Sequence, residues 1–373
     1  MDIDYKKRFQ FMYLSITLIT VIVVFIMQRP VGFIFGYSAL MLFFIFGFLS
    51  EWKINKNLMF IVVLSMFLTI PTLLYMAHGY STLLYLAGTI ISLLAAERMS
   101  RYSIVILLQT FQFIFWGYVL FSLIVYYIFR ESAEPFGELV AGLSTNGIPS
   151  FLIVIQVVLS LVTYVAKGKL PITSPIFTLV ISLLGIGRGS IIIALMILFF
   201  SLLFNSILLN KSRLKGLVWL ILLLTVLILV VLSNWSLVYD YLSVRTKLTQ
   251  GVYDIYRAQI FSEYISKISG LTLFTGASYE GTVIDALYAG NPHIAYIRTH
   301  AYLGIGVLML IVFSPLVFFL RKSRLSDKIV FLTFVLLIHL RIFSEPVLFP
   351  TIFDVFYFLI IFFYINFTSE IKS

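Results

Sequence analysis

The chain has 373 residues, of which 61% are hydrophobic and 11% are charged, and its formal net charge is +10. Soluble domains carry roughly 25% charged residues, so this composition excludes a water-soluble globular protein. Cysteine is absent from the sequence, which excludes a disulfide scaffold and thiolate metal ligands.

Apolar stretches of about 20 residues, the length needed to cross a hydrocarbon core, recur along the chain from Phe9 onward. We therefore predict an all-α, polytopic integral membrane protein that forms a single membrane domain over residues 1–373. Hydropathy predicts twelve spans, at roughly residues 9–27, 31–50, 58–76, 79–96, 102–129, 151–166, 172–187, 189–209, 217–234, 301–320, 329–344 and 351–367. No small-x-small cleavage site follows the first span, so we expect an uncleaved helix there.

The charged residues predict how the helices are oriented. If the N-terminus is cytoplasmic, 17 of the 26 Lys and Arg residues lie in short cytoplasmic segments, and 10 of the 16 Asp and Glu residues lie on the outer side. The net positive charge is thus a positive-inside signal rather than a nucleic-acid-binding surface. This orientation predicts that both termini are cytoplasmic.

One long polar segment, residues 235–300, interrupts the apolar sequence, and we predict that it forms a large loop at the outer face. Because the chain concentrates its ionisable groups there, we expect its chemistry or recognition in this loop. The outer face has no supply of ATP or nucleotide sugars, so a reaction there needs a substrate that is already activated, such as a lipid-linked pyrophosphate. The sequence has no HExxH, CxxC or Walker motif and predicts no metal site or cofactor.

A glycine-rich turn, Gly185–Ser190, lies at a predicted outer junction between two spans and contains Arg188. Glycines let a backbone approach an anion closely, and the N–H groups that open the next helix favour negative charge. Arg188 would add a bidentate contact to a phosphate. The structural alternative is a tight turn whose arginine only reaches the membrane surface.

The polar loop is predicted to contain a helix over Val252–Ile268. On it, Arg257 shares one stripe with three apolar residues: Phe261, Tyr264 and Ile268. An unpaired charge on an apolar face is costly. Arg257 is therefore a ligand-binding residue or the partner of Asp254, three residues earlier, and the two roles are compatible.

The end of the polar loop reads Asn291-Pro292-His293, with Arg298 and His300 just before the next span. A histidine near its ordinary pKa of about 6.5 can accept a proton at neutral pH. Each histidine could instead be an interfacial hydrogen-bonding residue. The neighbouring arginines favour a catalytic role for His293.

In this order, the motifs resemble the O-antigen polymerase and ligase superfamily of bacterial envelope glycan enzymes. The superfamily's Ser-Arg-Gly-Ala-like turn corresponds to Gly187–Ser190. Its Arg-x-x-x-Trp/Phe helix corresponds to Arg257–Phe261, and its Gly-x-Gly turn corresponds to Gly276–Ser278. Its Pro-His-Asn/Ser element corresponds to Pro292–Ile294, and the Gly-x-Gly that follows corresponds to Gly304–Gly306. The resemblance covers roughly residues 180–310. The chain departs from the pattern at Gly187, Ser278 and Ile294.

The resemblance implies a metal-independent glycosyltransferase of the bacterial cytoplasmic (inner) membrane that polymerises a surface polysaccharide, such as the O-antigen of lipopolysaccharide. Its donor would be an undecaprenyl-pyrophosphate-linked oligosaccharide. Arg188, Arg257 and Arg298 would bind the pyrophosphate in place of a divalent ion, and His293 would be the general base on the acceptor hydroxyl. A chain-length regulator protein is a candidate partner.

Two alternative functions remain open on the sequence. An O-antigen ligase would transfer the glycan to lipid A-core instead of to a new repeat unit. A lipid-linked sugar flippase or other transporter would use ionisable groups within the spans, for which the candidates are His339, Arg341, Glu345 and Asp354. Arg341 and Glu345 are four residues apart and could simply pair. Against transport, the sequence shows no repeated halves.

Overall fold

The computed structural model describes residues 3–27, 30–51, 56–75, 77–140, 145–209, 218, 221–222, 225, 229, 232–246 and 254–370. These residues form helices joined by turns and loops, with no β-strand among them. The predicted all-α class is confirmed for this part of the chain.

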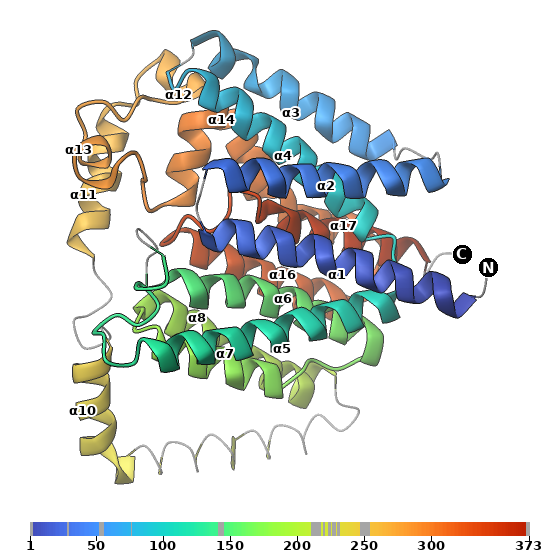
Figure 1. Ribbon diagram of the computed structural model, residues 1–373, viewed down its shortest axis with the longest axis vertical. Coiled ribbons are helices and arrows are strands. Elements are labelled where there is room, and N and C mark those ends of the chain that lie inside the picture. The colour runs from blue at the N-terminus through green and yellow to red at the C-terminus, as the bar shows by residue number, and fades with distance from the viewer. Residues whose placement is uncertain are drawn as a thin grey trace. The chain divides into compact units, whose positions relative to one another are not determined.

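Figure 1 shows the helices in chain order. The N-terminal part contains α1 (Ile3–Met27), α2 (Pro30–Glu51), α3 (Lys56–Tyr75), α4 (Tyr80–Met99), α5 (Ile104–Ile128), α6 (Gly147–Lys167), α7 (Thr173–Leu184), α8 (Arg188–Leu203), the π-helical turn η1 (Phe204–Leu208) and α10 (Trp235–Arg245). The C-terminal part contains α11 (Ile255–Ser266), α12 (Leu271–Thr275), α13 (Val283–Tyr288), α14 (Ala295–Phe313), the 3-10 turn η3 (Ser314–Leu316), α15 (Val317–Leu320), α16 (Leu325–Ile342) and α17 (Asp354–Glu370).

Among the described residues, seven helices are long and apolar enough to cross a membrane. They are Tyr5–Met27, Leu58–Tyr75, Tyr80–Met99, Ile104–Ile128, Gly147–Lys167, Arg188–Leu208 and Ala295–Leu320. Three other predicted spans correspond to the shorter apolar helices Gly32–Gly47, Thr173–Leu184 and Asp354–Thr368. The predicted span 217–234 lies largely outside the described residues, and the predicted span 329–344 falls in α16, which is not one of the seven. The membrane-spanning character therefore stands, and the number twelve stays a prediction.

The chain divides into two compact units. Unit 1 contains Met1–Tyr102, Asp254–Lys322 and Ile342–Ser373, and unit 2 contains Ser103–Tyr253 and Ser323–Arg341. In unit 1, α4 packs on α17 and α2, α2 packs on α1, and α14 packs on α3. Apolar side chains of α17 are buried over most of the helix, from Val355 to Tyr364, so α17 is a central core element of this unit.

Unit 2 is built around α6, whose apolar window is 94% buried. α6 packs on α5, α7 and α8. It ends at Gly168, which adopts a left-handed conformation with φ 66° and donates its N–H to the Tyr164 carbonyl, a common way to end a helix. The Tyr164 hydroxyl donates to Oδ1 of Asp327, 2.5 Å away, and so joins α6 to α16 inside the unit.

The segment of unit 1 that precedes α14 contains three short helices. α11 packs on α13, whereas α12 packs on both α3 and α14 (Figure 1). α14 is interrupted at Gly304, which has φ 77° and ψ 174°. A Cβ at this position would overlap the Thr72 hydroxyl and the Phe274 carbonyl oxygen. The bend in α14 is therefore the point at which α3 and α12 approach it.

Gly304→Ala should destabilise the protein, because its φ and ψ lie in a region that is essentially restricted to glycine and the methyl group has no room. We expect a cost of about 1–3 kcal/mol, measured as a lower midpoint of thermal unfolding in detergent. Gly117→Ala is the matched control, since Gly117 lies within α5 and nothing is within 4 Å of its Cβ position. Equal midpoints for the two variants would contradict this account of the bend.

Candidate functional site

The N-terminus of α11 is fixed by Asp254, whose Oδ1 accepts the backbone N–H of Arg257 at 3.2 Å. An aspartate at this position satisfies one of the free donors of the first helical turn. The helix covers Ile255–Ser266 of the predicted range, and Val252 and Tyr253 lie outside the described residues.

The predicted apolar stripe of this helix is partly wrong. Tyr264 is buried as expected, but Phe261 is 45% exposed and the other buried residue is Ile260. Ile260 and Tyr264 are four residues apart and pack with Tyr279, Ile284 and Ile294 in one small core. Arg257 is thus at the edge of the packed face of α11, where a charge can keep ionic partners.

Arg257 pairs with two carboxylates. Its Nη1 lies 3.4 Å from Oδ2 of Asp254, and its Nη2 lies 3.7 Å from Oε2 of Glu345. The pair with Asp254 confirms the structural interpretation of Arg257. The pair with Glu345 joins α11 to the loop that follows α16, 88 residues later in the chain.

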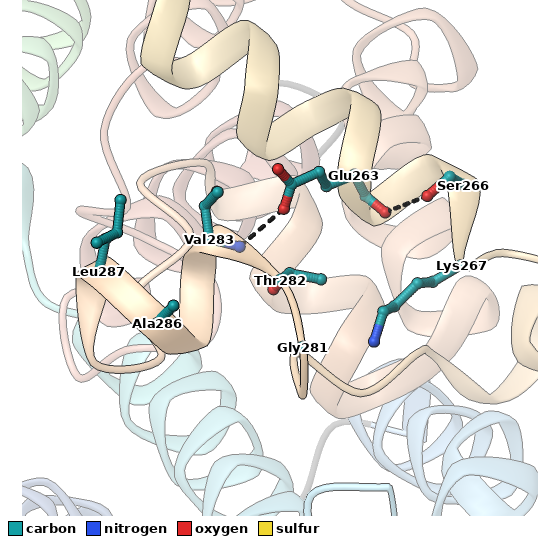
Figure 2. Close-up of a pocket in the computed structure, with 8 residues that line it drawn as sticks. All are labelled: Glu263, Ser266, Lys267, Gly281, Thr282, Val283, Ala286 and Leu287. Atoms are coloured by element: carbon teal, nitrogen blue, oxygen red, sulfur yellow. Dashed lines mark hydrogen bonds between the residues drawn. The ribbon is translucent and has the colours of Figure 1, made fainter.

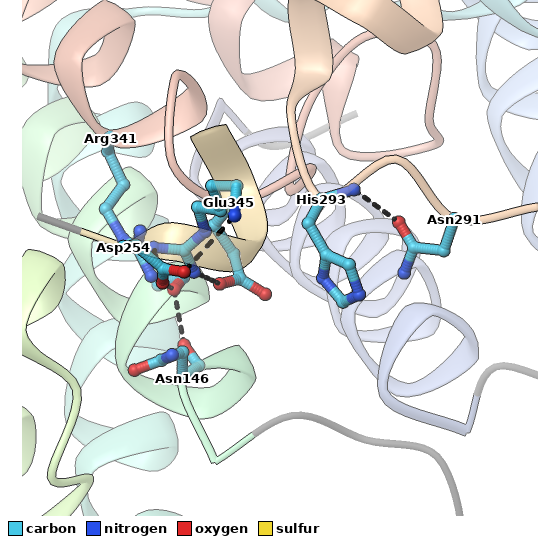
Figure 3. Close-up of polar contacts among 8 residues, drawn as sticks. Asn146, Asp254, Asn291, His293, Arg341 and Glu345 are labelled. Carbon is cyan, nitrogen blue, oxygen red and sulfur yellow. Dashed lines mark hydrogen bonds and ion pairs between the residues drawn. The ribbon is translucent and has the colours of Figure 1, made fainter. Parts of the chain in front are cut away.

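His293 lies on the turn that enters α14. Its backbone has φ 52°, an unusual value for a residue other than glycine, and its N–H donates to Oδ1 of Asn291 at 3.1 Å (Figure 3). The ring packs edge-to-face on Tyr288, with 4.9 Å between centroids. No hydrogen bond to a ring nitrogen of His293 is found among the described residues, so both nitrogens remain open to a ligand.

The surroundings keep His293 neutral at pH 7. Partial burial is the largest effect and lowers its pKa from the ordinary 6.5. The charges of Glu345 and Asp254 raise this pKa, whereas those of Arg257 and Arg298 lower it. We call these five residues the ionic cluster; all belong to unit 1.

Arg298 is engaged with the backbone of the loop between α16 and α17. Its Nε donates to the Phe349 carbonyl at 3.1 Å, and its Nη2 donates to the carbonyls of Pro346 and Leu348 at 2.6 and 2.9 Å. Three of the five guanidinium N–H groups therefore position this loop, which carries Glu345. The predicted role of Arg298 as a substrate ligand stays a prediction, and only its remaining N–H groups could serve it.

His300 connects α14 to α11 and α12 through a chain of hydrogen bonds. Its Nε2 lies 2.8 Å from the Leu273 carbonyl, and its Nδ1 lies 2.8 Å from the Tyr264 hydroxyl. A carbonyl can only accept, so Nε2 carries the proton, and in the neutral ring Nδ1 accepts from Tyr264. The Tyr264 oxygen in turn accepts the Ala277 N–H at 3.3 Å. His300 is thus a buried structural residue.

Arg188 belongs to unit 2, where it is the first residue of α8. The glycines before it serve packing: a Cβ at Gly185 would overlap Pro149, and one at Gly187 would overlap the Asn146 side chain. The left-handed residue of this turn is Ile186, with φ 67°. Packing thus accounts for both glycines, and the expectation that they let the backbone approach an anion stays a prediction.

A shallow, open pocket of about 560 Å³ lies between α11 and α13 (Figure 2). Glu263 crosses it, and its Oε2 accepts the Val283 N–H at 2.7 Å. This hydrogen bond, together with one that the Gln259 side chain donates to Oε1, lowers the pKa of Glu263. None of the predicted site residues lines this pocket.

Sequence reasoning missed two members of the arrangement. It suggested that Glu345 could pair with Arg341 or lie on a transport path, and it did not predict the pair of Glu345 with Arg257. It grouped Asp354 with the same path, whereas Asp354 accepts the backbone N–H groups of Phe349 and Thr351 at 2.7 and 3.0 Å. No motif signals a contact between segments so distant in sequence. Among the described residues, no group of three His, Asp or Glu side chains could hold a metal ion.

Comparison of the chain with protein-family models, with curated proteins and with solved structures gave no significant match.

Tyr264→Phe should destabilise the protein, because it leaves the buried His300 Nδ1 and the Ala277 N–H without their partner. The cost of an unsatisfied buried group is about 1–3 kcal/mol, and thermal unfolding in detergent measures it. Tyr279→Phe is the matched control: this neighbouring hydroxyl is buried without a hydrogen-bond partner among the described residues, so its removal should be neutral or stabilising. The hydrogen-bond chain is refuted if Tyr279→Phe is the more damaging change.

The pKa of His293 should lie below 6.5. It should shift in opposite directions when an acidic and when a basic neighbour is neutralised. Glu345→Gln removes a charge that raises it, so the pKa should fall further; Arg257→Gln removes a charge that lowers it, so the pKa should rise. Histidine ring NMR against pH, assigned with His293→Gln, measures both shifts. Asp285→Asn, on exposed α13, is the control and should leave the pKa unchanged. Shifts of the same sign in the two cluster variants would contradict the arrangement.

Proposed function

We propose that the chain is a polymerase of a bacterial surface polysaccharide, which joins undecaprenyl-pyrophosphate-linked oligosaccharide repeat units at the outer face of the cytoplasmic membrane. One observation carries the proposal: Arg257 and His293, remote in sequence, belong to one ionic cluster with Glu345 and Arg298. A cationic side chain beside a neutral histidine supplies what a transfer from a pyrophosphate donor requires, an anion ligand and a proton acceptor.

Arg257 is suited to bind the pyrophosphate. Its contacts with Asp254 and Glu345, at 3.4 and 3.7 Å, are longer than the roughly 2.7–2.9 Å of charge-assisted hydrogen bonds. The guanidinium can therefore exchange a loose carboxylate contact for a bidentate phosphate contact. In the transition state it would neutralise the charge that develops on the leaving pyrophosphate, the part that a divalent ion plays in other enzymes.

His293 would be the general base. The acceptor sugar hydroxyl attacks the anomeric carbon of the donor glycan, and a new carbon–oxygen bond forms. The bond between that carbon and the pyrophosphate oxygen breaks, with its electron pair leaving on the lipid pyrophosphate. The hydroxyl proton passes to a ring nitrogen of His293. The lowered pKa keeps the ring unprotonated, and so available as a base, at neutral pH.

The other two arginines take different parts in the proposal. Arg298 acts mainly as a positioning residue, because three of its N–H groups hold the loop that carries Glu345. Arg188, in unit 2, is proposed by itself as an anion-binding residue at the start of α8. Support for it comes from its place at a helix N-terminus and from its motif.

The proposed topology has twelve membrane crossings with both termini in the cytoplasm. The seven candidate spans and three shorter apolar helices support ten of these crossings. The bias of Lys and Arg toward the predicted cytoplasmic segments supports the orientation. In this orientation, α11, α12 and α13 belong to the outer-face loop, where a lipid-linked donor is accessible.

A ligase would use the same ionic cluster with a different acceptor, so it remains the second candidate. A flippase has less support, because two of the groups that suggested a transport path have structural partners. Glu345 pairs with Arg257, and Asp354 accepts backbone N–H groups of its own loop.

Deletion of the gene in the native host, followed by a gel of surface polysaccharide, tests the function. A polymerase deletion should remove the polymer ladder and leave one repeat unit attached. Complete absence of attached glycan would instead indicate the ligase or the flippase. An unchanged ladder would overturn the proposal.

Purified protein with a synthetic lipid-linked repeat unit tests the residues. His293→Ala should lower turnover on the order of 100-fold or more with donor binding and thermal stability retained. Arg188→Ala should reduce polymer strongly, and Arg188→Lys should restore it only partly, since an ammonium lacks the bidentate fork. His300→Ala should lose thermal stability instead. Normal turnover of His293→Ala would eliminate His293 as the base.

A further inference from the structure

The short helix α12 lies outside the candidate spans, yet most of its side chains are large, apolar and exposed. Leu271 is 61% exposed, Leu273 42% and Phe274 57%. Three large apolar side chains within four consecutive residues form a compact patch, which we call the α12 patch. Such a patch exposed to water is unfavourable and indicates an interaction surface.

The position of α12 indicates which environment covers the patch. α12 packs on α3 and α14, two helices that are candidate spans (Figure 1). The Thr72 hydroxyl and the Phe274 carbonyl oxygen both lie next to the position that a Cβ of Gly304 would occupy. Phe274 therefore lies level with the last turn of α3, which ends at Tyr75.

The end of α3 at this level also faces outward with apolar side chains. Leu74 is 82% exposed and Tyr75 46%, and Leu74 belongs to the candidate span Leu58–Tyr75. A tyrosine at the end of a span is typical of the boundary between hydrocarbon and headgroups. The α12 patch is thus continuous with a surface that lipid covers if α3 crosses the membrane.

Both hydroxyls of α12 and several of its backbone groups have hydrogen-bond partners within the protein, as an apolar environment requires. The Thr272 hydroxyl donates to the Lys267 carbonyl at 3.0 Å and accepts the Ser269 N–H at 2.8 Å. The Thr275 hydroxyl donates to the Leu271 carbonyl at 3.1 Å. The Leu273 carbonyl accepts from His300, and the Gly276 N–H donates to the Thr272 carbonyl at 3.0 Å.

The backbone around α12 is also held in place, so the patch cannot turn inward. A Cβ at Gly276 would overlap the carbonyl oxygens of His300 and Ala301, which shows how closely this segment lies on α14. His78 adds a bond between its Nε2 and the Ala277 carbonyl at 3.1 Å. A rigid backbone with outward apolar side chains is suited to insertion into a lipid layer.

We propose that α12 is an interfacial membrane anchor, whose patch of Leu271, Leu273 and Phe274 inserts into the lipid layer beside the end of α3. A stable protein–protein interface needs roughly 800 Å² on each partner, which three side chains do not supply. A lipid surface has no such requirement, because each apolar group contributes as it enters. The anchor is independent of the proposed enzymatic function and fixes the height of α11 and α13 above the membrane.

Site-directed spin labelling tests the anchor directly, because the chain has no cysteine and each variant carries one label. Leu271→Cys and Phe274→Cys report on the patch, and Leu74→Cys is the lipid-exposed reference. Leu287→Cys is the matched control, since Leu287 is 70% exposed but lies on α13, which packs on α11. The full chain is reconstituted in vesicles of phosphatidylethanolamine and phosphatidylglycerol, and collisions of each label with oxygen and with a water-soluble nickel chelate are compared.

Labels at 271 and 274 should collide more with oxygen than with the nickel chelate, as the label at 74 does, whereas the label at 287 should show the reverse. Preferential nickel collisions at both 271 and 274 would overturn the anchor. Protection of both labels from the two reagents would overturn it too, since another protein segment or a second copy would then cover the patch. Lipid exposure at 287 equal to that at 274 would refute a specific role for α12. Each labelled protein must elute from size exclusion as the unlabelled chain does.

Discussion

The hydrogen bonds that Arg298 donates to the loop between α16 and α17 are the interaction on which the candidate site depends. A loop at the end of buried helices must find partners for its backbone groups. Arg298 serves three of its carbonyls, and Asp354 serves two of its N–H groups. With both kinds of group satisfied, the loop has a defined course and holds Glu345 next to Arg257. The positions of the charges in the ionic cluster follow from this backbone arrangement.

A second set of hydrogen bonds explains why His293 and His300, seven residues apart, have different roles. His300 uses both ring nitrogens to connect α14 with Tyr264 and with the Leu273 carbonyl. His293 uses its backbone N–H in the turn, and its ring contacts Tyr288 edge-on. The first ring is therefore committed to the fold. The second keeps its nitrogens accessible to a proton from a ligand.

Local patterns in the sequence predicted local structure well. Hydropathy located the seven candidate spans to within a few residues, apart from α14, which starts six residues before the predicted 301. The i, i+3 spacing predicted the pair of Asp254 with Arg257. The pairing of Arg257 with Glu345, the loop contacts of Arg298 and the packing reason for Gly187 were out of reach. Each depends on which distant segments meet in the folded chain, and that is set by the packing of whole helices rather than by neighbours in sequence. The stripe through Phe261 was wrong for a related reason: a short helix buries the side that its neighbours cover, here Ile260 and Tyr264.

The two carboxylates around Arg257 have a consequence for the selectivity of the proposed anion site. The ionic cluster contains two carboxylates, of Asp254 and Glu345, and two guanidinium groups, of Arg257 and Arg298. A monovalent ion such as chloride would displace a carboxylate and gain no more than it replaces. A ligand that carries several negative charges on adjacent phosphates gains more than one contact for each carboxylate displaced. In the proposed function, this balance of charges would favour a pyrophosphate over a monovalent anion.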